Sequence, residues 1–278
     1  MKALAVLLAA LLLAASAHAG NKEPVNAGPF VPSPDTAVAA MLREAQVGPE
    51  DFVIDLGSGD GKIVRTAAVV FGARCFGVEI KDELVTQSNE AARKEGIADR
   101  VRFVKQDLFK TDISQATVLT MYLLPDTVNM LKDKLLSELK PGTRVVSHDY
   151  GLAGWRPEKT LEMDLQEKVA ISGVTTTIIY VYVVPARVAG TWNAKVPANV
   201  SRGAVRFDLK QQVTSVSGNA RVDGTEIPLE DAKLKGDQLT FRLAGRKAVF
   251  AGTVKGSGIE GTVEAGGIKS VWSASLGK

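Results

Sequence analysis

The sequence predicts an α/β protein: a seven-strand Rossmann-like sheet with a C-terminal antiparallel hairpin, followed by a small all-β, barrel-like domain of eight strands. Three observations lead to this prediction. In the first half, short apolar runs alternate with amphipathic stretches of helical length. A glycine-rich loop follows the first of these runs. After about Gly190 the helical periodicity disappears, and short alternating runs separated by glycines replace it.

The first half is typical of βαβ units on a parallel sheet. Strands are expected at residues 52–56, 74–79, 101–105, 117–123 and 143–147, and helices at 35–46, 62–71, 82–95 and 127–138. The half closes differently. Two extended segments, 161–171 and 174–184, flank a tight turn at Ser172-Gly173, which predicts an antiparallel hairpin.

The second half is predicted to form a small barrel. Its strands are expected at residues 189–196, 203–209, 213–222, 226–234, 238–243, 248–254, 258–263 and 269–274, and its large core residues are Trp192, Phe207, Phe241, Phe250 and Trp272. Eight strands are enough to close a sheet. The boundary falls in Pro185–Gly190, which predicts domains at 20–188 and 189–278. The β domain is either a spacer or surface for an unidentified partner, or a barrel that holds a small ligand.

The N-terminus is typical of a secretory signal peptide, residues 1–19. Lys2 precedes the apolar run Ala3–Ala15, and Ala17-His18-Ala19 has the small-x-small pattern of a cleavage site. An uncleaved anchor is the alternative, but this run is shorter than the roughly 20 residues that span a bilayer. No later stretch is apolar enough to do so. We therefore expect a chain exported to the periplasm or the medium, without a stable membrane span after cleavage.

Composition argues against several classes of function. The chain has 34 basic and 31 acidic side chains without a Lys/Arg cluster, which gives no reason to expect a nucleic-acid partner. Cys75 is the only cysteine, so no intrachain disulfide forms, and its apolar surroundings predict a buried thiol. One of the two histidines lies in the signal peptide. His148 alone is too few ligands for a zinc site, and no metal is expected.

The glycine loop is the most informative segment. Residues 53–62 run from a buried strand through Gly57, Gly59 and Gly61 into a helix, where glycines allow a ligand to approach the backbone. Glu79 ends the next strand, a position from which an acidic residue binds ribose hydroxyls. Asp107 ends the strand after that, where its carboxylate can accept the exocyclic amine of an adenine. The sequence therefore predicts a nucleoside-binding site at the C-terminal strand ends.

Two details narrow the cofactor. The spacing is G-x-G-x-G, and Lys62 stands where the dinucleotide fingerprint has its third glycine; no G-K-[ST] follows, which excludes a P-loop. Asp55, two residues before the loop, adds negative charge to the site. That charge suits a cationic sulfonium or the amino group of a bound amino acid better than a pyrophosphate.

These residues resemble a known family. Residues 55–61, with Glu79 and Asp107 downstream, are similar to the class I, seven-strand S-adenosylmethionine-dependent methyltransferases. The segments 29–34, 107–109, 121–125 and 142–148 more narrowly resemble the mitochondrial protein-lysine N-methyltransferases that act on the c-ring protein of ATP synthase and on the adenine nucleotide translocase. The likeness spans about residues 29–157. The β domain and the secretory signal lie outside it.

The resemblance implies S-adenosylmethionine as cofactor, with Ser58 and Leu108 joining Asp55, Gly57, Gly59, Gly61, Glu79 and Asp107 in binding it. It also implies a protein lysine as acceptor. The alternatives are a small-molecule methyltransferase and an exported, non-catalytic binding or scaffold protein that keeps the fold.

Methyl transfer from an activated donor depends mainly on positioning. Tyr122 follows the fourth strand and is the residue expected nearest the reaction; the alternative is a core aromatic. His148 either contacts the acceptor or caps a loop. Asp149 is expected to point away from it if the strand continues. Without a histidine–carboxylate pair, a nitrogen acceptor is favoured over an oxygen acceptor.

Overall fold

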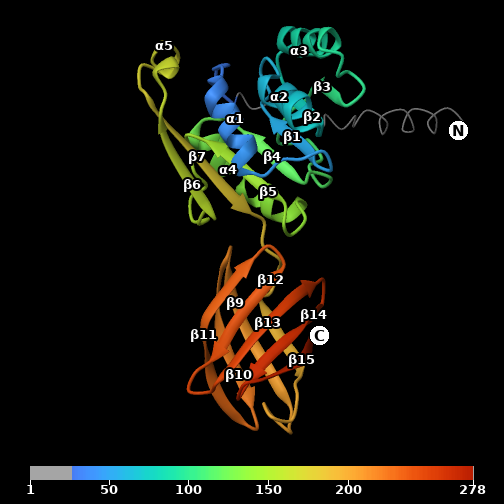
Figure 1. The fold of residues 1–278 in the computed structure, drawn as a ribbon, viewed down its shortest axis with the longest axis vertical. Helices are drawn as coiled ribbons and strands as arrows, with labels where there is room; N and C mark the ends of the chain where they lie inside the picture. The colour runs from blue at the N-terminus through green and yellow to red at the C-terminus, as the bar shows by residue number, and fades with distance from the viewer. Residues whose placement is uncertain (1–26, 278) are drawn as a thin grey trace, which may run out of the picture.

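The structure, a computed structural model, describes residues 27–277 and contains two sheets, one in each half of the chain (Figure 1). The predicted signal peptide lies outside the described residues and stays a prediction. None of the helices within 27–277 is long and apolar enough to span a bilayer.

The first sheet has seven strands in the order β3-β2-β1-β4-β5-β7-β6. The strands are β1 (Phe52–Leu56), β2 (Arg74–Glu79), β3 (Val101–Lys105), β4 (Val118–Met121), β5 (Arg144–His148), β6 (Lys159–Asp164) and β7 (Thr176–Val183). The first five are parallel, and β7 runs antiparallel to both β5 and β6. The predicted fold class is confirmed.

Helices cover both faces of this sheet (Figure 1). Helices α1 (Asp35–Glu44), α2 (Lys62–Phe71) and α3 (Asp82–Lys94) pack in one apolar cluster, and α4 (Pro125–Glu138) packs in another. Successive strand residues point to opposite faces, so Val53 joins the first cluster and Ile54 the second. Cys75 is buried in the first cluster, where burial raises its pKa to about 12. The prediction of a buried thiol is confirmed.

The predicted tight turn between the last two strands is wrong. A short 3-10 helix, η1 (Gln166–Lys168), and one helical turn, α5 (Val169–Ser172), connect β6 to β7. Gly173, with φ 77°, ends that turn in the left-handed conformation common at helix C-termini. This connection carries Lys168 to a buried position beside the end of β5.

The second sheet is a closed eight-strand barrel, with strand order β10-β11-β12-β13-β14-β15-β8-β9. Its strands are β8 (Gly190–Lys195), β9 (Val205–Gln212), β10 (Ser215–Val222), β11 (Thr225–Lys235), β12 (Gln238–Leu243), β13 (Ala248–Lys255), β14 (Gly258–Ala265) and β15 (Ile268–Leu276). The five predicted core aromatics are all buried. Phe241 and Phe250 stack at 4.9 Å between ring centroids, and Phe207 meets both edge-on. This packed interior favours a solid module over a ligand-holding barrel.

The barrel joins the first sheet at the edge where the parallel strands begin (Figure 1). The Ala186 N–H donates to the Gly236 carbonyl at 2.8 Å, and a Cβ on Gly236 would lie 3.3 Å from Gly142 Cα, just before β5. Lys235 and Glu158 form an ion pair at 3.4 Å. Val188 is buried in the barrel core, so a truncation that leaves the barrel behind is best made before it.

We expect a chain of residues 20–185 to fold and to bind S-adenosylmethionine with the affinity of the full chain. The barrel has its own core, and its contacts with the first sheet are few. Thermal unfolding and calorimetric titration would check this expectation. An aggregated or molten product would show that the barrel belongs to the folding unit of the first sheet, and that the division near residue 188 is wrong.

Candidate active site

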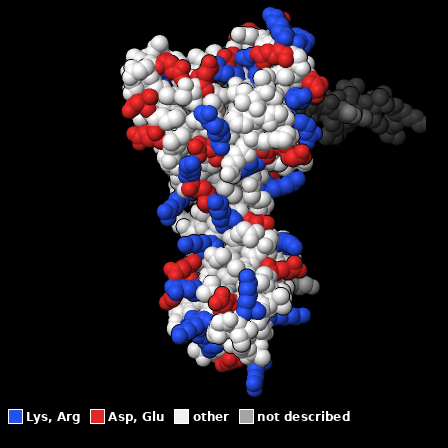
Figure 2. Space-filling view, viewed as in Figure 1, with Lys and Arg blue, Asp and Glu red and all other residues white. Residues whose placement is uncertain are grey.

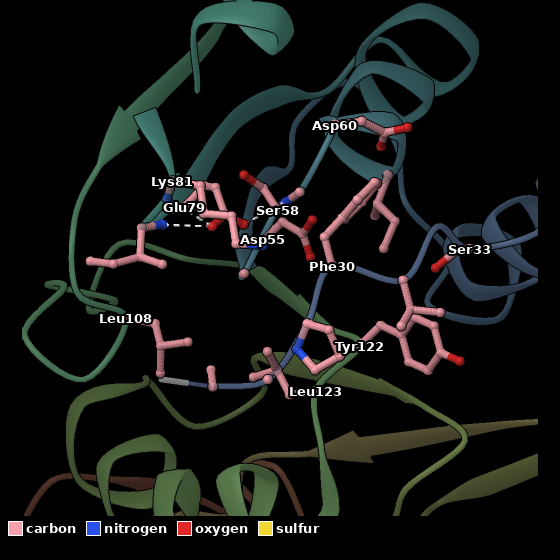
Figure 3. A pocket seen from close by; sticks show the side chains of 18 of the residues that line it. Phe30, Ser33, Asp55, Ser58, Asp60, Glu79, Lys81, Leu108, Tyr122 and Leu123 are labelled. Carbon is pink, nitrogen blue, oxygen red and sulfur yellow. Dashed lines mark hydrogen bonds between the residues drawn. The ribbon is translucent and has the colours of Figure 1, made fainter. Parts of the chain in front are cut away.

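A cavity of about 240 Å³ opens at the C-terminal ends of the parallel strands. Among the predicted site residues, Asp55, Gly57, Ser58, Gly59, Glu79, Asp107, Leu108 and Tyr122 line it. Figure 3 shows Asp55, Ser58 and Glu79 on one side, Leu108 and Leu123 on another, and Tyr122 beside Ser33. Gly61 is not in the lining; its Cβ would lie 2.5 Å from Phe103 Cζ, so the glycine is needed for packing inside the domain.

The glycine loop requires its glycines. Gly57 and Gly59 have φ of 77° and 53°, in the left-handed region that side chains disfavour. A Cβ on Gly57 would lie 2.7 Å from Leu123 Cδ2, and one on Gly59 would overlap the Phe30 ring. Both positions keep the backbone bare where it faces the cavity.

The N–H groups of this loop are largely used by the protein itself. Those of Gly57 and Ser58 donate to the Val78 carbonyl at 3.0 and 2.9 Å, and that of Gly61 donates to the Ser58 carbonyl at 2.8 Å. Phosphate-binding loops instead leave such groups free for the anion. The loop geometry therefore supports the exclusion of a pyrophosphate ligand.

The Glu79 carboxylate ties the loop to the end of β2. Its Oε2 accepts the Gly59 N–H at 3.0 Å, and its Oε1 accepts the N–H groups of Ile80 and Lys81 at 2.7 and 3.0 Å. A carboxylate has about four acceptor sites. Glu79 thus retains capacity for a ribose hydroxyl, as predicted, while its position is fixed by three backbone donors.

Asp55 is the most perturbed carboxyl group at the site. It is 1% exposed, and its Oδ1 accepts a hydrogen bond from the Thr120 hydroxyl at 2.7 Å. Burial raises the pKa of Asp55 to about 7, and the negative charges of Asp60 and Glu79 add to that rise. A cation in the cavity would favour the ionised form of Asp55.

Asp107 and Leu108 form the wall below the loop. Asp107 Oδ1 accepts the Phe109 N–H at 2.9 Å, and Oδ2 lies 3.8 Å from Lys110 Nζ. This leaves Oδ2 available to a ligand amine, the role predicted for Asp107. Leu108 supplies apolar surface beside it.

The segment before α1 covers the cavity. Gly28, Pro29, Phe30, Val31 and Ser33 all contribute to the lining. Lys62 Nζ holds this segment, because it donates to the Ser33 carbonyl at 2.9 Å and pairs with Asp35 at the same distance. The proline-rich sequence of this segment suggests an extended arm, but nothing in it specifies the docking partner.

The acceptor side of the cavity is formed by Tyr122 and the end of β5. The Tyr122 ring lies on the His148 ring, with 4.0 Å between centroids. Burial, and next the nearby Asp149 carboxylate, raise the pKa of Tyr122, so its hydroxyl stays protonated. Burial lowers the pKa of His148 to about 4, against the opposing effect of Asp149. The imidazole is therefore neutral at neutral pH.

The prediction that Asp149 points away from His148 is wrong. The strand ends at His148, and Asp149 takes φ 62°, which turns its carboxylate back to 3.6 Å from His148 Nε2. Aspartate tolerates the left-handed conformation better than most side chains. A histidine and a carboxylate therefore do meet, and the argument for nitrogen over oxygen from their separation does not hold.

The residues fit S-adenosylmethionine. Ser58 Oγ is buried in the loop without a hydrogen-bond partner among the described residues, and it faces the ligand side of the motif. The bare backbone at Gly57 and Gly59 leaves room for a nucleoside. Three carboxylates, Asp55, Asp60 and Glu79, give the cavity the negative charge that a sulfonium and an amino group require.

Comparisons with known proteins agree with this geometry. Residues 55–159 match the family model described as the ANTKMT methyltransferase domain. A protein-lysine N-methyltransferase of Saccharolobus islandicus is 43% identical over 157 residues, covering 56% of this chain and 93% of that protein. This chain belongs to the protein-lysine N-methyltransferase family. The methyltransferase uses S-adenosylmethionine as its cofactor.

More distant relatives of the methyltransferase share only part of their length with it. The Xenopus laevis lysine N-methyltransferase named for the c-ring protein of ATP synthase is 33% identical over 47% of this chain and 57% of its own length. The adenine nucleotide translocase lysine N-methyltransferase of Mus musculus is 32% identical over 52% of this chain and 57% of its own. The chain thus spans a little over half of each animal protein.

A solved structure also resembles the methyltransferase. It is described as an RNA methyltransferase from Salinibacter ruber in complex with S-adenosyl-L-homocysteine, with a TM-score of 0.52 and 41% identity. The match covers 57% of this chain and 96% of that one. The bound product of methyl transfer supports the cofactor assignment.

We expect donor binding to depend on pH through Asp55. Its raised pKa leaves the group largely protonated below pH 7, and a cationic donor binds best to the ionised form. Affinity should therefore rise roughly fifteenfold between pH 5.5 and 7.0, as the ionised fraction rises. Calorimetric titration with S-adenosylmethionine would measure it.

Asp55→Asn is the matched control, because the amide oxygen can still accept from Thr120. Its affinity should be lower and flat with pH. S-adenosylhomocysteine, which lacks the sulfonium charge, separates the two roles: a pH dependence that persists with it places Asp55 by the amino group. A wild-type affinity that does not change with pH would contradict the assignment.

Glu79→Ala should weaken S-adenosylmethionine binding ten- to a hundredfold. It removes a charge-assisted acceptor, worth about 1.5–3 kcal/mol, and releases the Gly59 N–H that positions the loop. Glu90→Ala, on the exposed face of α3, is the control and should bind normally. Equal affinity in both variants, with unchanged melting temperatures, would contradict a role of Glu79 in donor binding.

Proposed function

We propose that this methyltransferase modifies the side-chain amine of a lysine in a protein. The observation that carries the proposal is the archaeal protein-lysine N-methyltransferase, which matches at 43% identity over nearly its whole length. The site supports the same acceptor. Aromatic and apolar side chains flank the end of the cavity at Tyr122, including Phe30, Leu123 and Leu124.

The residues at that end can act on a lysine in two ways. A narrow apolar passage orients the long side chain toward the cofactor, and positioning of this kind lowers the entropic cost of reaction. It also removes water from the amine, which favours loss of its proton, because burial disfavours the charged form. A lysine must be neutral before its nitrogen can act as a nucleophile.

When bound, S-adenosylmethionine supplies an activated methyl group, whose bonding electrons stay on sulfur as the lysine nitrogen forms the new bond. The protein contributes binding and orientation. Glu79 and Asp107 hold the nucleoside, Asp55 favours the cationic end, and Tyr122 separates the donor cavity from the acceptor side. No described residue needs to form a covalent bond.

RNA is the second candidate acceptor, because the Salinibacter ruber structure is described as an RNA methyltransferase. Charge argues against it here. Proteins that track a phosphate backbone present a basic surface, whereas Figure 2 shows lysine and arginine interspersed with acidic side chains on the face in view. The net charge is only +3. A protein acceptor accords better with this surface.

We also propose that the reaction takes place outside the cytoplasm, in the periplasm or the medium. Support comes from the signal-peptide pattern of residues 1–19. The proposal implies that donor and acceptor meet the enzyme in that compartment, or before export is complete.

The acceptor is tested by incubating residues 20–278 with methyl-labelled S-adenosylmethionine and an extract of the protein's own cell envelope, with cellular RNA in a parallel reaction. We expect label in a protein band, mapped by mass spectrometry to lysine. Glu79→Ala should reduce the labelling. Label confined to RNA, to small molecules or to oxygen atoms would overturn the lysine assignment; no label, despite donor binding, would favour the scaffold alternative.

A further inference from the structure

A second cavity adjoins the cofactor cavity at Tyr122. Tyr122, Tyr150 and Ser172 line both, and the second is completed by Asp149, Lys168, Val174, Thr176 and Ile178. The second cavity therefore reaches the cofactor from the side of β7 and the β6–β7 connection. The rim of this opening includes exposed apolar side chains, among them Tyr150, Val169 and Val174.

A buried ion pair forms one wall of this cavity. Lys168 Nζ lies 2.7 Å from Asp149 Oδ2 and also donates to the Thr176 carbonyl. Asp149 Oδ1 accepts the Ile178 N–H at 3.1 Å. The side chains of Lys168 and Asp149 are only 4% and 13% exposed. Burying two charges is costly, and the fold places this pair beside the reaction rather than in the core.

The geometry behind the pair adds a second observation. His148 is fully buried, and its Nε2 has no hydrogen-bond partner among the described residues. It lies 3.6 Å from Asp149 Oδ1, while Nδ1 lies 3.4 Å from Ser33 Oγ. A buried polar atom without a partner is unusual in a folded protein, and this one lies against the carboxylate on the acceptor side.

We propose that the acceptor lysine enters through this second cavity, and that the Asp149–Lys168 pair receives its amine in the neutral, nucleophilic form. The inference rests on the proposed lysine methylation. In this arrangement Asp149 accepts a hydrogen bond from the amine, while Lys168 cancels the charge of Asp149. The two are positioning residues, since neither contacts the reacting methyl carbon.

The charge balance explains why a pair, and not a lone carboxylate, serves this purpose. A lone Asp149 would attract the acceptor as an ammonium ion and hold its proton. A neighbouring cation opposes that effect, as for lysines whose pKa is lowered beside another cationic group. With Lys168 in place the wall is polar but carries no net charge, and the acceptor proton passes to water at the mouth.

The other groups that face this end leave the balance to the pair. Tyr122 and Tyr150 are phenols, His148 is neutral because burial lowers its pKa to about 4, and Ser33, Ser172, Thr176 and Ile178 do not titrate. The carboxylates of the donor site lie beyond Tyr122, around the glycine loop. Asp149 and Lys168 are thus the charged side chains in the lining of the second cavity.

The test is the pH profile of kcat/KM with a synthetic peptide that carries the lysine labelled by the enzyme. Lys168→Met leaves Asp149 unbalanced, so the acid limb should move up by about one pH unit. Asp149→Asn leaves Lys168 unbalanced, so the limb should move down by a similar amount. The double variant Asp149→Asn/Lys168→Met restores neutrality and should return the limb close to that of the wild type.

Several controls keep the outcome decisive. Lys134→Met/Glu138→Gln removes an ion pair on the surface of α4 and should not move the limb. Calorimetric affinity for S-adenosylmethionine should be unchanged in every variant. The double variant also retains a measurable enzyme if either single variant unfolds, since it buries no unpaired charge.

Limbs that stay in place in the single variants, or that move in the same direction, would show a purely structural pair and overturn the inference. If only the double variant folds, a limb more than about half a pH unit from that of the wild type would do the same. These outcomes leave lysine methylation intact, because the wild-type enzyme still labels the peptide. Failure of the wild type to label any lysine would instead remove the proposed function.

Discussion

The hydrogen bond from the Gly59 N–H to the Glu79 carboxylate is the contact on which the rest of the site depends. It joins the loop after β1 to the end of β2, so the bare glycine backbone and the ribose-binding carboxylate occupy fixed positions relative to each other. The same contact uses up a loop N–H group that could otherwise bind an anion. With Asp55 buried beneath the loop, the site is organised for a ligand that is cationic at one end and a nucleoside at the other.

Charge is handled differently on the two sides of Tyr122. On the donor side, carboxylates gather without basic partners, and the pKa of Asp55 rises to about 7 as a result. On the acceptor side, the one carboxylate in the cavity lining is paired with a buried lysine. The difference follows from what each side must hold. A permanent sulfonium cation benefits from net negative charge, whereas an amine that must lose a proton does not.

The sequence predicted the fold class and the glycine loop well, because both depend on local patterns. Periodicity identified the strands of both sheets, and strand-end positions brought Asp55, Glu79 and Asp107 to one cavity. It missed the pair at the acceptor side. Lys168 lies in a connection that resembled a tight turn, and its burial comes from tertiary contacts with Asp149 and Thr176 that no local signal records. The turn of Asp149 toward His148 was missed because β5 ends one residue earlier than a continuing strand would, and a left-handed aspartate carries no sequence signature of its own.

The position of the barrel limits what it contributes to the reaction. Its contacts with the first sheet are at Gly142 and Glu158, beside the start of β5 and β6, whereas both cavities lie where the parallel strands end. No barrel residue appears in either cavity lining. Recognition of the lysine and its immediate neighbours therefore falls to the arm before α1 and the connection between β6 and β7, which border the openings. A barrel with a packed aromatic core at the far edge can act on the reaction only by holding a partner or an acceptor protein near the enzyme, which raises its local concentration without altering the transfer site.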